Sequence, residues 1–200
     1  MRPVAETTRS RREEILQGAK HLFAERGFRE TNLNDVAARL GVRRQAIYHY
    51  FESKDEILFE LIEGAGHALA RAAQPVLDSD RPPLDKLREI VKVHVRHVLT
   101  DADVFRIQIN ELNKLSGDRG ATVRRHHSAY YHRVAEVIAE GQRDGLLVDI
   151  PAVAQALVII GMCQWVVFWY SPDAKLSIEE MADYIAELAI NGARRQGGGS

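Results

Sequence analysis

The 200-residue sequence predicts an all-α protein of two helical domains, and three observations support that fold class. Apolar residues recur at helical spacing through most of the chain. No segment alternates apolar and polar residues between hairpin turns, as a half-buried strand does. Clusters of glycine and proline separate the helical segments.

The composition is typical of a cytoplasmic globular protein, since 46% of the residues are hydrophobic and no secretory signal is recognisable. The single cysteine, Cys163, excludes an intrachain disulfide, and its apolar neighbours indicate a small core residue. The net charge is only −1, but residues 1–51 carry ten Arg or Lys against six Asp or Glu. The N-terminal quarter is therefore the positively charged part of the chain.

The first helix of a predicted helix-turn-helix begins after Asn32, a favourable N-cap, and Asp35 is placed to complete a capping box. Gly41 ends this helix, because glycine tolerates the left-handed backbone that turns the chain. The apolar face of the helix consists of Leu33, Val36, Ala37 and Leu40.

The second helix of the motif carries side chains suited to DNA. Such a helix enters the major groove with its N-terminus, near base edges. Arginine pairs with guanine, glutamine with adenine, and alanine touches the thymine methyl group, whereas Tyr48 and His49 are placed for phosphates. The predicted DNA-binding residues are Asn32, Arg43, Arg44, Gln45, Ala46, Tyr48, His49 and Lys54. An ordinary surface hairpin with a solvated basic face is the alternative interpretation.

Lys54 opens the next helix, which Ser53 caps with Glu56 at the capping-box position. A cation at the start of a helix opposes the helix dipole, and a phosphate beside Lys54 would explain its presence there. A freely solvated lysine fits the sequence equally well.

Residues 10–58 resemble the DNA-binding domain of the TetR family of bacterial repressors. The resemblance implies a homodimeric repressor that a ligand releases from operator DNA, with Tyr48 and Lys54 on phosphates. The sequence departs from the family at Arg43, where serine usually caps the second helix, and at Tyr50, where histidine is common. The matching segments are Leu22-Phe23-Ala24-Glu25-Arg26-Gly27-Phe28, Asp35-Val36-Ala37, Gly41-Val42, Ile47-Tyr48-His49-Tyr50-Phe51 and Ser53-Lys54-Asp55-Glu56-Ile57-Leu58.

The remainder of the chain predicts helices only. We expect a helix-turn-helix DNA-binding domain at residues 1–53, a helical effector-binding and dimerisation domain at 54–196, and a flexible tail at 197–200. Breaks are expected at Pro75, 80–83, 117–120, Gly145 and 171–173. The expected helices are residues 54–74, 84–100, 103–116, 121–144, 152–170 and 177–194.

The segment from Ala156 to Tyr170 is apolar on nearly all sides, so a helix formed by it cannot lie exposed on the protein surface. Its fifteen residues are fewer than the roughly 20 that a membrane span needs, so no membrane contact is expected. Together with the next helix, which Ser177 and Glu180 cap, it would form a four-helix interface of the kind that TetR dimers use. The predicted dimerisation residues are Val158, Met162, Val166, Met181, Ile185 and Leu188.

The other helices are expected to surround a small apolar effector. Aromatic residues at this spacing also fit an ordinary core. Glu111 is the one acidic residue expected near such a pocket, where it would favour a cationic drug. The predicted ligand-binding residues are Phe105, Ile109, Leu112, Tyr130, Val134, Trp165, Phe168 and Trp169.

The histidines do not form a recognisable metal site in the sequence. His94 and His97 stand three residues apart, and His126, His127 and His132 cluster on another helix, but no carboxylate or cysteine completes either set at a convincing local spacing. The sequence also lacks a nucleophile elbow, a phosphate loop or a catalytic carboxylate pair. We therefore expect no metal, no cofactor and no enzyme, with a metal-dependent hydrolase as the remote alternative.

A second resemblance concerns the effector. Residues 165–170 and 176–180 resemble TetR relatives that sense acyl-CoA thioesters from fatty-acid or sterol catabolism. This resemblance implies an acyl chain in the apolar interior, with Arg119, Arg124 or Arg125 near the CoA phosphates. A sensor of lipophilic drugs that controls an efflux gene is the alternative, and activation in place of repression stays open.

Overall fold

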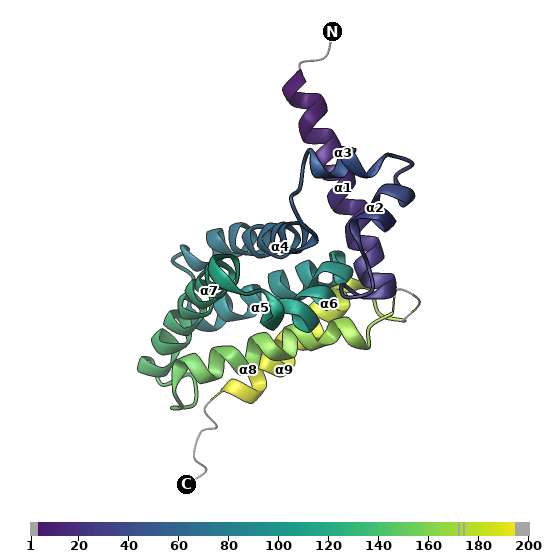
Figure 1. Cartoon of the computed structure of the whole chain (residues 1–200). Coiled ribbons are helices and arrows are strands. Elements are labelled where there is room, and N and C mark those ends of the chain that lie inside the picture. The colour runs from purple at the N-terminus through teal and green to yellow at the C-terminus, as the bar shows by residue number, and fades with distance from the viewer. Residues whose placement is uncertain (1–3, 172, 174, 195–200) are drawn as a thin grey trace. The chain divides into compact units, whose positions relative to one another are not determined.

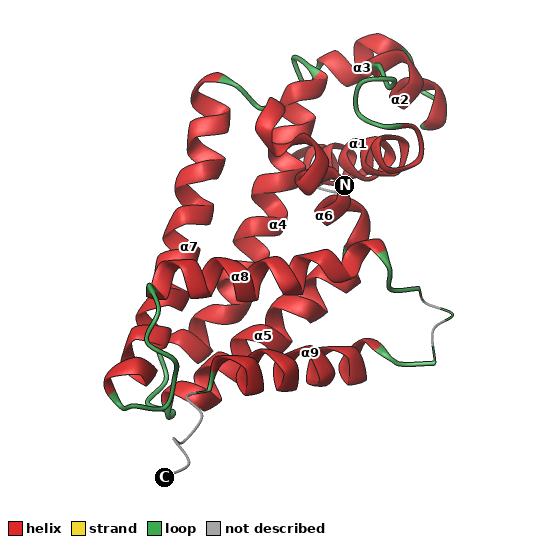
Figure 2. Ribbon diagram, turned by 90° about the horizontal axis from the view of Figure 1, so that it is seen from below, coloured by secondary structure: helices red, strands yellow, loops and turns green. Residues whose placement is uncertain are grey.

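The chain is helical through most of its length (Figure 1). The structure is a computed structural model that describes residues 4–171, 173 and 175–194. Within these residues there is no strand, only an isolated antiparallel bridge between Leu147 and Arg194, which confirms the all-α prediction (Figure 2). The helices are α1 (Val4–Arg26), α2 (Leu33–Arg39), α3 (Arg44–Tyr48), α4 (Lys54–Leu77), α5 (Pro83–Thr100), α6 (Ala102–Glu111), α7 (Gly117–Arg143), α8 (Ala152–Trp165) and α9 (Ile178–Ala193), with two 3-10 turns, η1 (Leu112–Lys114) and η2 (Val166–Phe168).

The chain folds into two compact units, and each unit is assembled from two separate stretches. The first unit consists of Met1–Ala65 and Asp103–Val123, and the second consists of Gly66–Ala102 and Arg124–Ser200. Helix α4 therefore contributes its first half to one unit and its second half to the other. The boundary expected after residue 53 falls inside the first unit, and the expected tail at 197–200 lies outside the described residues.

The core of the first unit joins the helix-turn-helix to α6 and to the start of α7. Ile47 of α3 and Phe51 are fully buried, and the guanidinium of Arg12 lies 4.2 Å from the centre of the Phe51 ring. Arg12 also forms ion pairs with Glu56 and Glu60 of α4. The remaining core residues are Ile15, Ala19, Leu22, Phe23, Phe28, Leu33, Val36, Ala37, Ile57, Leu58, Leu61, Ile62, Val104, Ile107, Leu115 and Val123.

Helix α5 organises the second unit by packing against both α8 and α9 (Figures 1 and 2). Its buried apolar face consists of Leu87, Ile90, Val91, Val95 and Val98. Three ion pairs along the edge of the α5–α9 contact join Arg88 to Glu187, Lys92 to Asp183 (2.6 Å) and Arg96 to Glu179 (2.8 Å). The partners advance by four residues on one helix and retreat by four on the other, so the two helices are antiparallel.

Three expected helix boundaries were wrong. α4 continues through Pro75 to Leu77, because a proline in the last turn removes one hydrogen bond while Ala73 and Leu77 stay buried. α7 begins at Gly117, which has φ +60°, so this glycine alone turns the chain and the helix starts four residues early. The expected helix 103–116 ends at Glu111 and continues as η1.

Helix α8 is also shorter than expected. Its α-helical hydrogen bonding ends at Trp165, and η2 replaces the last turns that were predicted. None of the described helices combines the length and the apolar character that a membrane crossing requires. The predicted cap of α9 is confirmed, since Glu180 N–H donates to Ser177 Oγ (3.2 Å) and Ser177 N–H donates to Glu180 Oε2 (2.8 Å).

Candidate functional site

The helix-turn-helix forms as the sequence predicts. Asn32 Oδ1 accepts hydrogen bonds from the N–H groups of Asn34 (2.8 Å) and Asp35 (3.3 Å), and Asp35 Oδ2 accepts one from Asn32 N–H (2.8 Å). This reciprocal capping box fixes where α2 begins. Gly41 has φ +65°, and Val42 N–H donates to Ala37 O (3.0 Å), which closes the turn.

Helix α3 exposes the residues that were predicted to read DNA. Arg43, Arg44, Gln45, Tyr48 and His49 are exposed, and Ala46 is half-buried. Ile47, between them in the sequence, has no exposed surface and holds the helix on the core. The helix and its N-cap residue Arg43 therefore present two guanidinium groups, an amide and a phenol to solvent, as a major-groove reader requires.

The start of α3 lacks the side-chain cap that serine supplies in the family. Arg43 occupies the N-cap position with φ −75° and ψ 146°, an extended backbone, but its side chain makes no capping hydrogen bond. Within the helix, Arg44 Nη2 donates to Tyr48 Oη (2.6 Å), and the Arg44 guanidinium lies 5.0 Å from the centre of the Tyr48 ring. This contact orients two of the predicted DNA-binding side chains together.

Lys54 has three backbone partners in the first unit. Its Nζ donates to the carbonyl oxygens of Phe28 (2.8 Å), Arg29 (3.1 Å) and Thr31 (3.0 Å), and lies 4.5 Å from the centre of the Phe28 ring. An ammonium group has three N–H donors, so these carbonyls satisfy all of them. Lys54 therefore ties the start of α4 to the connection between α1 and α2.

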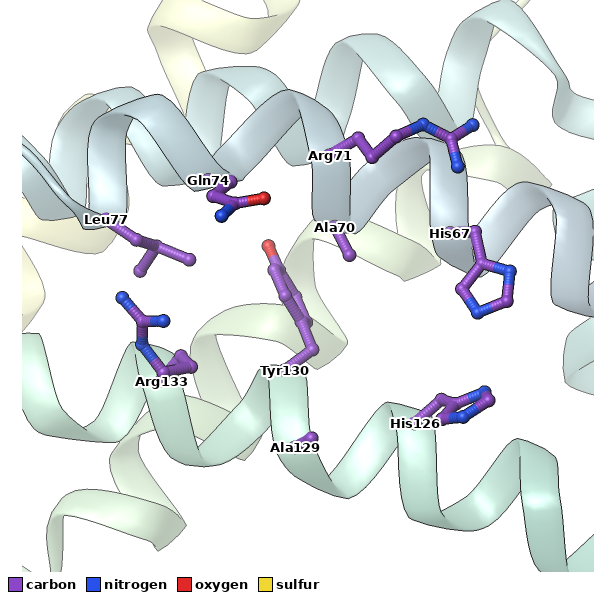
Figure 3. A pocket seen from close by; sticks show the side chains of 9 residues that line it. All are labelled: His67, Ala70, Arg71, Gln74, Leu77, His126, Ala129, Tyr130 and Arg133. Atoms are coloured by element: carbon purple, nitrogen blue, oxygen red, sulfur yellow. The ribbon is translucent and has the colours of Figure 1, made fainter.

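A cavity of about 370 Å³ lies between α4 and α7 in the second unit (Figure 3). Small and apolar side chains line part of it, and two guanidinium groups and two imidazoles stand around it. Figure 3 shows Tyr130 extending from α7 toward α4. The lining residues are His67, Ala70, Arg71, Gln74, Leu77, His126, Ala129, Tyr130 and Arg133.

The charged side chains that line this cavity are the guanidinium groups of Arg71 and Arg133. Arg133 pairs with Asp78 (2.7 Å) and with Glu136 (3.3 Å). Its hydrogen bond to Asp78 is the main cause that lowers the pKa of that exposed carboxyl. The lining residues include no Asp or Glu, so the cavity is better suited to an anionic ligand than to a cation.

Behind the cavity lies a buried polar pair. His94 Nδ1 of α5 and Tyr130 Oη are 3.2 Å apart, and His94 is only 1% exposed. Burial lowers the pKa of His94 to about 3, helped by the charges of His97 and His127, so its imidazole is neutral. Burial likewise raises the pKa of the Tyr130 hydroxyl and raises that of Cys163 to about 12, so both keep their protons.

The predicted ligand-binding residues do not all meet in one place. Tyr130 lines the α4–α7 cavity, whereas Val134 is fully buried in the same unit. Phe105, Ile109 and Leu112 belong to the first unit, as does Glu111, which pairs with Lys114 (2.7 Å). Arg119 also belongs to the first unit, and Arg124 and Arg125 are exposed on α7 but are not among the lining residues.

Trp165, Phe168 and Trp169 lie on the outside of the second unit. Trp165 is 61% exposed, and Trp165 and Trp169 line an apolar groove of about 360 Å³ over α8 and α9. Four of the predicted dimerisation residues line the same groove, namely Met162, Met181, Ile185 and Leu188. Val158 is 72% exposed on α8, and Val166 is fully buried.

Sequence analysis missed the residues that α4 contributes to the cavity. Arg71 and Gln74 lie one turn apart, within a run of small residues that includes Ala70. A single arginine within a run of alanines could have indicated this cavity from the sequence. Alanine side chains are too small to fill the space beside a helix, and the arginine adds a charged group to that space. Two contacts of the histidines were also not predicted. His94 forms a hydrogen bond with Tyr130, and the centres of the His67 and His126 rings lie 5.0 Å apart.

The exposed, basic α3 on a capped helix-turn-helix defines the class of protein, a DNA-binding regulator with a second helical unit that holds a cavity. Residues 15–61 match the model of bacterial regulatory proteins of the tetR family, and residues 80–193 match that of the tetracyclin repressor-like C-terminal domain. The chain belongs to the TetR family. It is accordingly a transcriptional regulator and not an enzyme.

Similar proteins extend over nearly the whole chain. The HTH-type transcriptional repressor KstR2 of Mycobacterium tuberculosis is 26% identical over 196 residues, which cover 97% of this chain and 98% of that protein. The solved structure of KstR2, a ketosteroid transcriptional regulator, aligns with a TM-score of 0.86 at 24% identity over 93% of this chain and 96% of that one. AibR in complex with isovaleryl coenzyme A and operator DNA aligns with a TM-score of 0.81 at 22% identity, over 89% and 97%.

Proposed function

We propose that this regulator is a homodimeric repressor, bound to a palindromic operator and released by an acyl-CoA thioester. The observation that carries the choice of effector is the α4–α7 cavity, with an apolar part formed by Ala70, Leu77 and Ala129 and the guanidinium groups of Arg71 and Arg133 beside it. An acyl-CoA combines an apolar chain with anionic phosphates. The two parts of the cavity match the two parts of this ligand.

The names of the relatives support the same choice. KstR2 is named a repressor and a ketosteroid regulator, and AibR was solved with an acyl-CoA and with operator DNA. The cavity, in contrast, offers little to the lipophilic cations that a regulator of drug efflux would sense. Its lining residues carry arginine and histidine, while Glu111, the acidic residue considered for such a role, belongs to the other unit.

The proposed dimer uses the apolar face of α8 and α9. Large apolar side chains on this face are exposed in the single chain, and they include Val158, Trp165, Trp169, Tyr184 and Leu188. A contiguous apolar face of this kind is typical of a protein interface. In a two-fold dimer, the two α3 helices would read half-sites roughly 34 to 36 Å apart, which matches a palindromic operator.

The proposed mechanism is a shift between two conformations. An effector that binds better to the non-operator conformation lowers operator affinity by the difference between its two binding free energies. Helix α4 is the element to carry this coupling, because it contributes Lys54 to the first unit and Arg71 and Gln74 to the cavity in the second.

Thermal unfolding of the purified protein tests the effector class. The panel consists of CoA thioesters of increasing chain length, the matching free acids, free CoA, and lipophilic cations. A thioester at a hundredfold excess over its Kd should add about 2.7 kcal/mol to the free energy of unfolding and should release operator DNA. Stabilisation by the cations alone would contradict the proposal and favour a drug sensor.

A further inference from the structure

The His94–Tyr130 pair offers an oriented hydrogen-bond donor to the effector cavity. His94 comes from α5, is almost completely buried, and has no partner for Nε2 among the described residues. Tyr130 comes from α7, bonds to His94 Nδ1, and lines the cavity. The pair therefore connects a buried, neutral imidazole to the space in which the effector is proposed to bind.

The position of the His94 proton decides what Tyr130 can do. A neutral imidazole has one N–H, on either Nδ1 or Nε2. With the proton on Nε2, this buried N–H donor would have no acceptor. The Tyr130 hydroxyl would then donate its hydrogen to Nδ1 and could not donate to a ligand. With the proton on Nδ1, the imidazole donates to Tyr130 Oη and only a lone pair is left unpaired, which is the less costly arrangement.

We infer that His94 Nδ1–H donates to Tyr130 Oη, so that the Tyr130 hydroxyl is free to donate to the acyl carbonyl oxygen of the effector. This inference rests on the proposed function, and it adds the atom of the ligand that is recognised. Figure 3 shows the Tyr130 hydroxyl oxygen pointing toward α4, between Ala70 and Gln74. The small side chains of Ala70 and Ala129 leave the space that an acyl group needs.

The arrangement separates two kinds of recognition. Arg71 and Arg133 act on the anionic part of the ligand, which every CoA derivative shares. Tyr130 acts on the carbonyl, which a thioester has and the corresponding thioether lacks. His94 is a positioning residue, because it acts on the ligand only through Tyr130.

The test compares two ligands that differ only at this carbonyl, hexanoyl-CoA and S-hexyl-CoA. Calorimetric titration of the full-length protein should give a Kd for hexanoyl-CoA about tenfold lower than for S-hexyl-CoA, the value of one hydrogen bond. Tyr130→Phe should abolish this preference. Tyr131→Phe, which removes a neighbouring phenol that does not line the cavity, should keep it.

Variants of His94 test the positioning role. Asparagine places an amide N–H close to where Nδ1–H lies, so His94→Asn should keep most of the preference, whereas His94→Leu should reduce it. Equal affinity of the natural protein for both ligands, or a preference that survives in Tyr130→Phe, would overturn the inference and leave the proposed effector class intact. Failure of both ligands to bind would overturn the proposed function and this inference together.

Discussion

Lys54 shows how one side chain can support the DNA-binding unit through contacts within the protein. Its ammonium group is held by three carbonyl oxygens of the connection between α1 and α2 and lies over the Phe28 ring. Each of these is a charge-assisted contact that positions α2 relative to α4. The lysine at the start of α4 therefore has a structural reason to be there, besides the phosphate contact that the family resemblance implies.

We expect Lys54→Met to lower the free energy of unfolding by about 1–3 kcal/mol, because three carbonyls lose a charged donor. Urea unfolding measures this loss, and Lys175→Met, at an exposed position, serves as the control. The slope of operator affinity against salt should change by less than the 0.9 that one lost phosphate contact produces. A full change in slope with unaltered stability would instead place Lys54 on the DNA.

Arg43 occupies the N-cap position of α3 but makes no capping hydrogen bond, so a better N-cap residue should stabilise the protein. Its backbone already has the extended conformation of an N-cap, so Arg43→Ser should add about 0.5–1 kcal/mol of stability by capping α3. Arg43→Ala is the matched control, because it removes the guanidinium without supplying a cap. Equal unfolding midpoints for the serine and alanine variants would show that the cap does not form.

Residue-level predictions succeeded where the interaction is local in sequence. Asn32 and Asp35 are three residues apart, and Gly41 needed only its own backbone freedom, so both features were predictable. The partners of Lys54 lie 23 to 26 residues earlier in the chain, in a connection without a periodic pattern. No sequence spacing indicates such a contact, which depends on how α1, α2 and α4 pack.

At the scale of elements, the ion pairs along α5 and α9 hold two helices in one register. They are partly exposed, so each contributes little alone. Their value lies in selectivity, since sliding α9 by one residue would separate all three pairs. The antiparallel order of α5 and α9 is thus encoded in charge as well as in apolar contacts.

Exchange of charges tests this register. Lys92→Glu places a second carboxylate beside that of Asp183, and their repulsion should lower the midpoint of thermal unfolding by a few degrees. The double variant Lys92→Glu/Asp183→Lys should recover most of the loss. Both effects should shrink in high salt, because exposed charges are screened. A double variant no more stable than Lys92→Glu would contradict a direct pair.

The same pair predicts a pH dependence. The hydrogen bond from Lys92 lowers the pKa of Asp183 below its ordinary 3.8, assisted by the charges of Lys92, Arg96 and Arg88. A carboxyl with a lowered pKa in the folded state contributes stability above its unfolded pKa and loses it as the pH falls through the folded value. Asp183→Asn should therefore be less stable than the natural protein at pH 7. The difference should vanish near pH 2, as urea unfolding at both pH values would show.

Element-level prediction had a clear limit in the cavity between α4 and α7. The sequence predicted both helices and selected Tyr130. It could not show which face of α4 would lie opposite Tyr130, so Arg71 and Gln74 were missed and the exposed Trp165 and Trp169 were placed in the pocket. An apolar helix face fits a core, a pocket and a partner equally well until the packing is known.

At the scale of the whole molecule, neither unit is a continuous piece of the chain. The core of the first unit includes Val104, Ile107, Leu115 and Val123, which follow the first stretch of the second unit. A fragment of residues 1–65 would expose the apolar surface that these side chains cover. The sequence boundary after residue 53 reflects the motif, not the extent of this core.

We expect a fragment of residues 1–65 to lack a cooperative thermal transition, because its core is incomplete. Circular dichroism during heating measures this, with the full chain as the reference. Cooperative unfolding of the fragment, at a midpoint near that of the full chain, would mean that α6 and the start of α7 are dispensable for the first unit.

The buried thiol has a practical consequence. Cys163 is the single cysteine of the chain, is 1% exposed, and keeps its proton because burial raises its pKa to about 12. A thiol reagent can therefore modify the native protein only during moments when the second unit opens. The rate of modification therefore measures how often the second unit opens. A molecule that fills the cavity beside Tyr130 should slow this rate, so effector binding could be followed without DNA, a label or an engineered probe.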